Sequence, residues 1–204
     1  MTEKSSQKET EKQIACLILA AGSSSRFGGR KQLADVSGAP MIQHTIRQIK
    51  ACFDGTIFCV VGAYGDEVAV HITSDVEVIK FANWQEGMGA SIAHGVKTIR
   101  QKKEYDGILI AVVDQVALTC EDYKKLITPF DGNAIVASHY GGRCGVPALF
   151  PPSYFNQLEK LSGDRGAQSL LKDAQNPKVL VPMALAEFDI DTPHDLILFE
   201  NKIR

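Results

Sequence analysis

The sequence predicts an α/β fold, in which a single Rossmann-like three-layer α/β/α domain is built around a mostly parallel central sheet. Two observations predict it. Short runs of apolar residues, typical of strands buried on both faces, alternate with segments whose apolar residues recur at helical spacing. The chain has 204 residues, 45% of them hydrophobic and 23% charged, which suits one large domain, and it contains neither an internal repeat nor a Pro/Ser-rich linker.

The expected elements follow one another as strand, helix, strand. We expect strands at 14–19, 56–61, 76–80, 107–113, 134–138 and 179–181, and helices at 41–53, 64–71, 88–101, 120–128 and 166–174. A final helix begins at Thr192-Pro193, with Asp195 in its first turn. This alternation indicates parallel strands joined by right-handed crossovers. The segment 107–113 is apolar throughout, so it is expected at the centre of the sheet.

Composition excludes several kinds of partner. The formal net charge of −2 gives no overall attraction for nucleic acid or an anionic membrane, and no apolar run approaches the length of a membrane span, so neither partner is expected. Residues 1–13 are polar and predict a disordered tail rather than a secretory signal, followed by one domain at 14–204. The five cysteines form no Cys-x-x-Cys pair, which favours reduced thiols in the cytoplasm; Cys144 is expected to be an ordinary thiol.

The stretch 14–31 carries the strongest functional signal. An apolar strand, Ile14 to Leu19, runs into a loop of small and hydroxyl residues that ends in the cations Arg26, Arg30 and Lys31. Small residues let the backbone approach a ligand closely, and successive free N–H groups suit phosphate oxygens. We therefore expect a nucleotide-phosphate loop at the carboxyl end of the first strand, made of Leu19, Ala20, Ala21, Gly22, Ser23, Ser24, Arg26 and Lys31.

Two better-known phosphate loops do not fit this stretch. A Walker A loop has four residues between its first glycine and its Gly-Lys-Ser/Thr, whereas five residues separate Gly22 from Gly28, and Gln32 follows Lys31. A dinucleotide loop needs Gly-x-Gly-x-x-Gly and an acid about 20 residues later, and neither is present. A solvated Gly/Ser turn after a core strand is the alternative reading.

Two acidic residues are candidates for a Mg²⁺ site. Asp114 ends the central strand, at the sheet edge of the phosphate loop, where Mg²⁺ can bridge protein and phosphates. Capping the next helix is the alternative role of Asp114, but Thr119 and Asp122 already supply a better capping box. Near the C-terminus, residues 188–191 alternate apolar and acidic, which predicts a short strand that ends in Asp191, the candidate second ligand.

The phosphate loop reads Leu-Ala-Ala-Gly-x-Ser-x-Arg-Phe-Gly-x-x-Lys, from Leu19 to Lys31. This resembles the signature of the MobA-like nucleotidyltransferases, the family of the molybdenum-cofactor guanylyl- and cytidylyltransferases. Later segments of the chain resemble the family in the same order, at 83–91, 114–115, 141–147, 163–166 and 189–196. The resemblance covers nearly the whole chain and implies a nucleotide-diphospho-sugar transferase-like fold.

The resemblance also implies roles for individual residues. The implied catalytic residues are Lys31, Arg26 and Asp114, and the implied Mg²⁺ ligands are Asp114 and Asp191. The nucleotide side of the cleft would add Asn83, Gly87 and Ser91, and the second-substrate side would include Gly145, Pro147 and Asp164. Two positions depart from the family pattern: Val116 replaces a proline in the turn after Asp114, and Val146 replaces a histidine on the acceptor side.

The implied chemistry is nucleotidyl transfer, in which an acceptor phosphate attacks the α-phosphorus of a nucleoside triphosphate and pyrophosphate leaves. The Leu-Ala-Ala-Gly form is closer to the cytidylyl branch, which implies CTP and a molybdopterin acceptor, with a molybdenum hydroxylase or its maturation chaperone as a possible protein partner. One alternative is a relative that uses GTP or a sugar- or alcohol-phosphate acceptor. The other is a catalytically silent nucleotide- or pterin-binding carrier.

Overall fold

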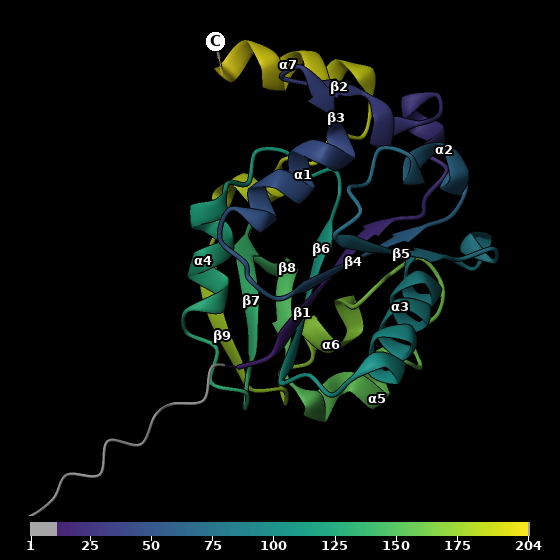
Figure 1. The fold of residues 1–204 in the computed structure, drawn as a ribbon. Helices are drawn as coiled ribbons and strands as arrows, with labels where there is room; N and C mark the ends of the chain where they lie inside the picture. The colour runs from purple at the N-terminus through teal and green to yellow at the C-terminus, as the bar shows by residue number, and fades with distance from the viewer. Residues whose placement is uncertain (1–11, 204) are drawn as a thin grey trace, which may run out of the picture.

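A seven-stranded sheet forms the centre of the molecule in the computed structural model, which describes residues 12–203 (Figure 1). Its order is β5-β4-β1-β6-β8-β7-β9. The strands are β1 (Ile14–Ala20), β4 (Thr56–Val61), β5 (Val76–Lys80), β6 (Gly107–Val112), β7 (Ile135–Tyr140), β8 (Arg143–Phe150) and β9 (Lys178–Pro182). Strands β5, β4, β1 and β6 are parallel, β8 is antiparallel to β6 and β7, and β9 is parallel to β7. Two short strands, β2 (Asp35–Val36) and β3 (Ala39–Pro40), pair separately.

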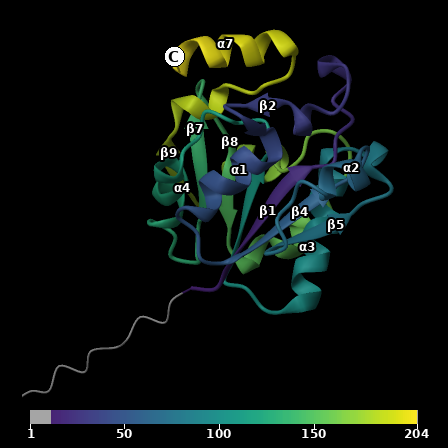
Figure 2. The same ribbon diagram turned by 45° about the horizontal axis from the view of Figure 1, so that its top comes forward.

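Helices cover both faces of this sheet, which confirms the predicted three-layer α/β/α arrangement (Figure 1). The helices are α1 (Met41–Lys50), α2 (Gly65–Ala69), α3 (Met88–Lys102), α4 (Cys120–Ile127), α5 (Phe155–Leu158), α6 (Gln168–Lys172) and α7 (Pro193–Ile203). Apolar residues of α1, α2 and α4 pack in one cluster, and those of α3, α5 and α6 pack in the other. Helix α7 lies across the top of the molecule, close to β2, in both views (Figures 1 and 2).

Strand β1 contributes side chains to both core clusters, one on each face of the sheet. All seven of its residues are buried, and they alternate between the layers: Cys16 and Ile18 pack on the α1 side, whereas Leu17 and Leu19 pack on the α3 side. Burying one such aliphatic side chain contributes about 1.5–3 kcal/mol. Helix α3 crosses close to β1, since a Cβ at Gly95 would lie 2.7 Å from Leu17 Cδ2. The core therefore fixes the position of the strand from which the phosphate loop emerges.

The second half of the chain differs from the expected pattern in one respect that affects the site. The alternating residues 188–191 do not form the predicted strand; they are irregular and follow a short 3₁₀ helix, Ala184–Glu187. Ile190 is completely buried and Phe188 packs against the same core cluster, so apolar contacts hold this segment instead of a strand ladder. The predicted capping box of Thr119 and Asp122 is confirmed at the start of α4.

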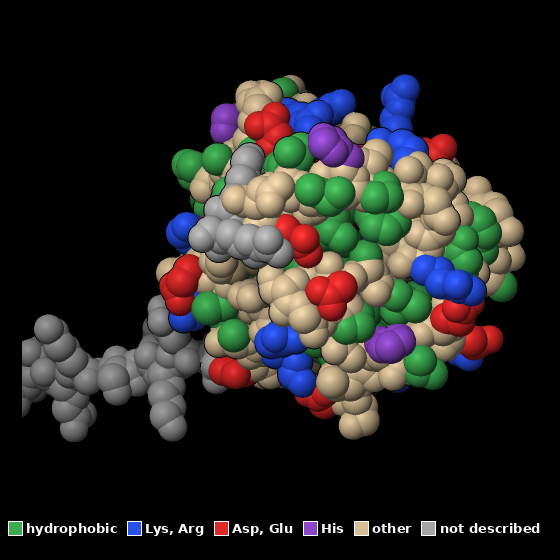
Figure 3. Space-filling model, turned by 90° about the horizontal axis from the view of Figure 1, so that it is seen from above, with side chains coloured by type: hydrophobic (Ala, Val, Ile, Leu, Met, Phe, Trp, Pro, Cys, Tyr) green, Lys and Arg blue, Asp and Glu red, His purple; other side chains and the backbone are tan. Residues whose placement is uncertain are grey.

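Several predictions concern the ends and the surface of the chain. Residues 1–11 of the predicted disordered tail lie outside the described residues, whereas the backbone N–H of Gln13 donates to Asp106 Oδ2 at 2.7 Å. Between residues 12 and 203, no helix combines the length and the hydropathy needed to cross a bilayer. Side chains of both charges are interspersed on the face seen from above (Figure 3). Cys144 packs against the cluster on the α3 side as a free thiol.

Candidate active site

The phosphate loop begins where β1 leaves the sheet, after Ala20. Its backbone adopts the left-handed conformation at Ser24 (φ 55°), Gly28 (φ 91°) and Gly29 (φ 120°). This conformation is uncommon for a residue other than glycine, so the fold holds Ser24 against its local preference. Strained backbone of this kind is concentrated at ligand sites, which makes the loop a candidate site on geometric grounds as well.

The buried side chain of Gln32 holds the loop in this shape. Its Nε2 donates to the carbonyls of Ala20 (3.0 Å) and Gly22 (2.8 Å), and its Oε1 accepts from Ser24 Oγ at 3.4 Å. Within the described part of the chain, the N–H groups of Gly22 and Ser23 have no hydrogen-bond acceptor. Free N–H groups in a loop of this kind are the donors that phosphate oxygens need.

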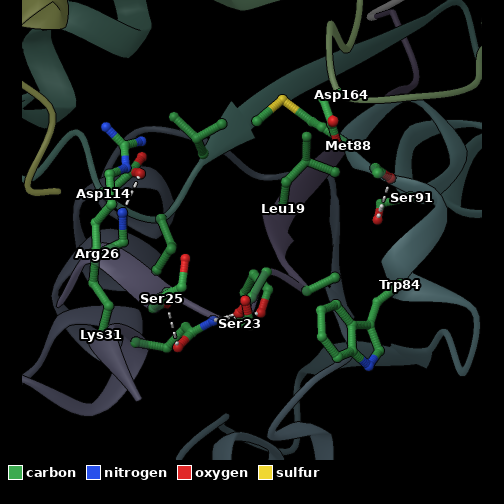
Figure 4. A pocket seen from close by; sticks show the side chains of 18 of the residues that line it. Leu19, Ser23, Ser25, Arg26, Lys31, Trp84, Met88, Ser91, Asp114 and Asp164 are labelled. Carbon is green, nitrogen blue, oxygen red and sulfur yellow. Dashed lines mark hydrogen bonds and ion pairs between the residues drawn. The ribbon is translucent and has the colours of Figure 1, made fainter. Parts of the chain in front are cut away.

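Four charged side chains, which we call the ion chain, line one end of the pocket. Lys31 Nζ lies 2.7 Å from Asp114 Oδ2 and 3.4 Å from Asp191 Oδ1, and Arg26 Nη1 lies 3.0 Å from Asp191 Oδ2. The Lys31 and Asp114 side chains are only 11% and 21% exposed, whereas Arg26 is 73% exposed at the pocket mouth. Figure 4 shows Arg26, Lys31 and Asp114 together. The structure thus brings together the charged residues predicted at three separate places in the sequence.

Asp191 reaches the ion chain through backbone contacts and a helix cap, not through the predicted strand. The N–H of Ile190 donates to the carbonyl of Asp114 at 3.0 Å, which ties this segment to the end of β6. Asp195 Oδ2 then accepts from the backbone N–H groups of Thr192 (2.7 Å) and Asp191 (3.1 Å). Thr192 Oγ1 in turn accepts from the Asp195 N–H at 3.3 Å, which completes a capping box at the start of α7.

The opposite end of the pocket is built from the segment between β5 and α3. In Figure 4, Trp84, Met88, Ser91 and Asp164 lie across Leu19 from the charged end. Gly87 adopts φ 98°, and a Cβ there would lie 2.5 Å from the backbone of Gly163. The Gly89 N–H donates to the Gly163 carbonyl at 2.7 Å, so the two segments are held together. This contact brings Asp164 into the pocket.

Most of the predicted site residues line one cavity of about 360 Å³. The predicted residues that line it are Leu19, Ala20, Ala21, Gly22, Ser23, Ser24, Arg26, Lys31, Gly87, Ser91, Asp114, Asp164 and Asp191. The residues that the sequence analysis missed are Ser25, Gln32, Trp84, Gln85, Met88, Val112 and Val113. Four of these seven, Ser25, Trp84, Gln85 and Met88, lie within the two quoted motif segments, so the motifs identified the region, and only the fold could show which side chains turn inward.

Three predicted residues lie outside this cavity. The Asn83 side chain donates to Glu86 Oε1 at 3.0 Å. Gly145 and Pro147 lie in β8, and a Cβ at Gly145 would overlap the Tyr140 hydroxyl at 2.1 Å, so this glycine makes room for a side chain of the fold. Asp164 was expected on the second-substrate side, but the structure places it in the same pocket as the phosphate loop. Of the three residues that the resemblance assigned to the second substrate, only Asp164 therefore lines this cavity.

The two departures from the family pattern have local explanations. Val116 is 3% exposed and packs in the core, and the turn that it occupies is closed by the Leu118 N–H donating to the Gln115 carbonyl at 3.1 Å. A ring nitrogen of His44 lies 3.1 Å from the Val116 carbonyl and supports the same turn. The Val146 carbonyl accepts from Gln115 Nε2 and from the Tyr140 hydroxyl, each at 3.2 Å. Neither valine disrupts the strand end that carries Asp114.

The donor set of the ion chain fits a Mg²⁺ ion. Lys31 Nζ lies within 3.4 Å of oxygens from both Asp114 and Asp191, so both acids face one point. Mg²⁺ in phosphate sites is held by one or two carboxylates together with substrate phosphates. Residues 12–203 contain no group of three or more His, Cys, Asp or Glu that could hold a metal through protein ligands alone. The pKa of Asp189 is raised to about 6, first by desolvation and then by the charges of Asp114 and Asp191, so negative charge is concentrated here.

Comparison with known proteins gives a consistent result. Residues 16–179 match the MobA-like NTP transferase domain. The bifunctional IPC transferase and DIPP synthase of Rubrobacter xylanophilus is 26% identical over 93% of this chain, which spans 52% of that protein. The molybdenum cofactor cytidylyltransferase of Escherichia coli is 24% identical, over 93% of this chain and 96% of its own length.

Solved structures share the fold. Rv0371c from Mycobacterium tuberculosis H37Rv superposes with a TM-score of 0.80 at 24% identity, over 93% of this chain and 97% of that one. A second structure of Rv0371c, in complex with manganese, gives a TM-score of 0.73 at 19% identity, over 91% and 97%. At these identities the superpositions show the common architecture.

Proposed function

The chain belongs to the MobA-like NTP transferase family, and on this basis we propose that it transfers CMP from CTP to the phosphate of molybdopterin and releases pyrophosphate. The observation that carries the proposal is the ion chain beside a phosphate loop with free N–H groups, since this combination of charges suits a triphosphate with a divalent cation. The choice of CTP is supported by the Leu-Ala-Ala-Gly sequence of the loop and by the likeness to the Escherichia coli cytidylyltransferase.

The reaction requires mainly positioning and neutralisation of charge. A phosphate oxygen of the acceptor attacks the α-phosphorus, and the bond to the pyrophosphate oxygen breaks. The acceptor phosphate is already ionised at neutral pH, so no residue is needed to remove a proton. The N–H groups of Gly22 and Ser23, with Arg26 and Lys31, would bind the triphosphate and stabilise the charge on the departing pyrophosphate. A Mg²⁺ ion on Asp114 and Asp191 would neutralise further phosphate charge.

The nucleoside would occupy the opposite end of the pocket. Trp84 offers an aromatic surface there, and Ser91 and Asp164 offer polar groups for a base or a ribose. Ser91 Oγ donates to the Gly87 carbonyl at 3.2 Å, so its position is fixed before a ligand arrives. The acceptor would approach the α-phosphate between the two ends.

A second candidate function is nucleotidyl transfer with a different substrate: a sugar or alcohol phosphate as the acceptor, or GTP as the donor. The specific observation in its favour is that Gly145 and Pro147, which the resemblance assigned to the molybdopterin side, lie outside the pocket. A cytoplasmic location and delivery of the product to a molybdenum hydroxylase or its chaperone belong to the molybdopterin version of the proposal.

The test is an assay of pyrophosphate release with each of the four nucleoside triphosphates and Mg²⁺, with molybdopterin, with a sugar or alcohol phosphate in its place, and without an acceptor. We expect release that depends on molybdopterin and a kcat/KM that favours CTP over GTP. A ratio that favours GTP would assign the chain to the guanylyl branch instead of the cytidylyl branch, and nucleotidyl transfer would remain the reaction. Pyrophosphate release only with a sugar or alcohol phosphate would show that this compound, and not molybdopterin, is the acceptor. Binding of CTP without pyrophosphate release from any acceptor would indicate a catalytically silent carrier.

A further inference from the structure

In the ion chain, the two cations that would bind a triphosphate are paired with the two carboxylates that would bind a divalent cation. Arg26 pairs with Asp191, while Lys31 pairs closely with Asp114 and more loosely with Asp191. The two positive and two negative side chains therefore neutralise one another inside the pocket. A ligand that engages either set must therefore compete with these pairings.

Either ligand alone would disturb this balance. A triphosphate that recruits Arg26 and Lys31 leaves two carboxylates without counterions beside its own negative charge. A divalent cation that recruits the carboxylates leaves the two side-chain cations beside it. Lys31 and Asp114 are only 11% and 21% exposed, so water compensates an unpaired charge on either of these two side chains poorly.

We infer that Arg26 and Lys31 act as internal counterions for Asp114 and Asp191, so that the triphosphate and the divalent cation bind as a unit and each alone binds weakly. When both arrive, the cations turn to the phosphates and the carboxylates turn to the metal, and no charge is left unpaired. Coupling of this kind is reciprocal, because each ligand must strengthen the other by the same factor. The inference rests on the proposed function, since it takes phosphates and a divalent cation as the ligands of this pocket.

A matched control pair outside the pocket joins the same loop to helix α2. Arg30 Nε lies 2.6 Å from Glu67 Oε2, with side chains that are 60% and 49% exposed. Neither residue lines the cavity. Glu67→Gln therefore removes the same charge from a partner of the same loop, without releasing a cation into the pocket.

The first arm measures the binding of metal-free CTP by calorimetry in EDTA. Asp191→Asn releases Arg26, and Asp114→Asn frees Lys31 from its closer partner, so each variant should bind metal-free CTP at least about fivefold more tightly than the wild type. Glu67→Gln should bind it as the wild type does. Circular dichroism and the melting temperature check that each variant is folded, and the two aspartate variants test the same prediction independently.

A double-mutant cycle separates ion pairing from a general loss of negative charge. If Asp191 acts by pairing with Arg26, then Asp191→Asn should tighten CTP binding much less in an Arg26→Met background than in the wild type. An equal gain in both backgrounds would overturn the inference, because only the field of the carboxylate would then matter.

The second arm measures the binding of Mn²⁺ alone by electron paramagnetic resonance. Lys31→Met removes the cation that competes for Asp114, so Mn²⁺ should bind at least about fivefold more tightly, whereas Arg30→Met should leave its affinity unchanged. Weaker or unchanged Mn²⁺ binding in Lys31→Met would overturn the inference. If the wild type nevertheless releases pyrophosphate from CTP, the proposed function stands although the inference about internal counterions fails. If CTP does not bind the wild type even with Mg²⁺, both fail.

Discussion

Two buried glutamines, each next to a charged residue of the ion chain, support two walls of the pocket. The phosphate wall is the phosphate loop with Lys31, and the carboxylate wall carries Asp114 and Asp191. Gln32 follows Lys31 and Gln115 follows Asp114, and each is 2% exposed. Each also donates from Nε2 to two backbone carbonyls: Gln32 to Ala20 and Gly22, and Gln115 to Ala186 (2.7 Å) and Val146 (3.2 Å).

The range of these contacts differs. The partners of Gln32 lie 12 and 10 positions away, within the loop that it supports, whereas those of Gln115 lie 71 and 31 positions away. The Oε1 of Gln32 accepts from Ser24, while that of Gln115 is buried without a partner among residues 12–203. The phosphate wall is therefore shaped by one stretch of sequence, and the carboxylate wall by three distant segments that must first fold together.

The largest effect is expected from removing the cation that connects the two walls. Lys31→Ala should lower kcat/KM for CTP by about 10²–10³, because the loss of one charge-stabilising contact in the transition state costs about 2.7–4 kcal/mol. Steady-state pyrophosphate release measures it, with the melting temperature as a check on folding. Arg30→Ala, on the same loop but paired with Glu67, is the control and should turn over normally. Normal turnover of Lys31→Ala at saturating CTP would contradict its role.

The second prediction concerns the carboxylate wall alone. Asp114→Asn and Asp191→Asn should each severely weaken Mg²⁺-dependent turnover, because both carboxylates face the point that Lys31 Nζ now occupies. The double variant should lose far less than the sum of the two single losses, since groups that act as a unit are not additive. The measurement is kcat/KM as a function of Mg²⁺ concentration. Fully additive losses would show that the two acids do not share a metal.

The third prediction tests the two glutamines by their stability. Gln32→Leu should lower the free energy of unfolding by about 2 kcal/mol, because it leaves the carbonyls of a strained loop without their donor. Gln115→Leu should cost about 1 kcal/mol, since it also removes a buried oxygen without a partner, and the Val146 carbonyl keeps its bond from the Tyr140 hydroxyl. Urea unfolding of both variants measures the difference. A larger loss for Gln115→Leu would reverse the comparison.

The same contrast explains which parts of the fold the sequence predicts. The strand expected at 56–61 has those bounds in the structure, and those at 14–19 and 107–113 differ by one residue, because buried parallel strands produce continuous apolar runs. The edge strand expected at 76–80, Val-Glu-Val-Ile-Lys, also has its expected bounds, although it is only partly buried. The phosphate loop is equally local, so its residues and its position at the end of β1 could be predicted together. Local patterns also identified the capping box at Thr119.

The carboxylate wall could be predicted only in part. Asp191 was identified as a candidate, but the alternation of apolar and acidic residues at 188–191 imitates a strand, whereas the structure holds the segment by buried Ile190 and by one backbone bond to Asp114. The same limit applies to Asp164, whose entry into the pocket depends on the contact between Gly87 and Gly163. Contacts between distant segments leave no periodic signal in the sequence.

The smallest effect is expected where the carboxylate wall depends on a helix cap. Asp195→Ala should lower the free energy of unfolding by about 0.5–1 kcal/mol, because an acid in the first helical turn interacts with the free N–H groups there. Asp122→Ala removes the matching acid from the capping box of α4, where the Asp122 carboxylate accepts from Thr119 and pairs with Lys125. Only Asp195→Ala should also raise the Mg²⁺ concentration for half-maximal turnover, since Asp195 holds the backbone of Asp191.

The pH dependence of Asp195→Ala follows from the direction of its pKa shift. Hydrogen bonds from Thr192 lower the pKa of Asp195 below the ordinary value of 3.8. A folded-state pKa below the unfolded one means that the unfolded chain binds the proton more readily, so the charged carboxylate stabilises the fold above pH 3.8. The stability difference between wild type and Asp195→Ala should therefore be constant from neutral pH to about pH 5 and shrink as the pH falls below 3.8. Urea midpoints across this range measure it, and a difference that persists undiminished at pH 2 would show that packing of the side chain, rather than its charge, stabilises the cap.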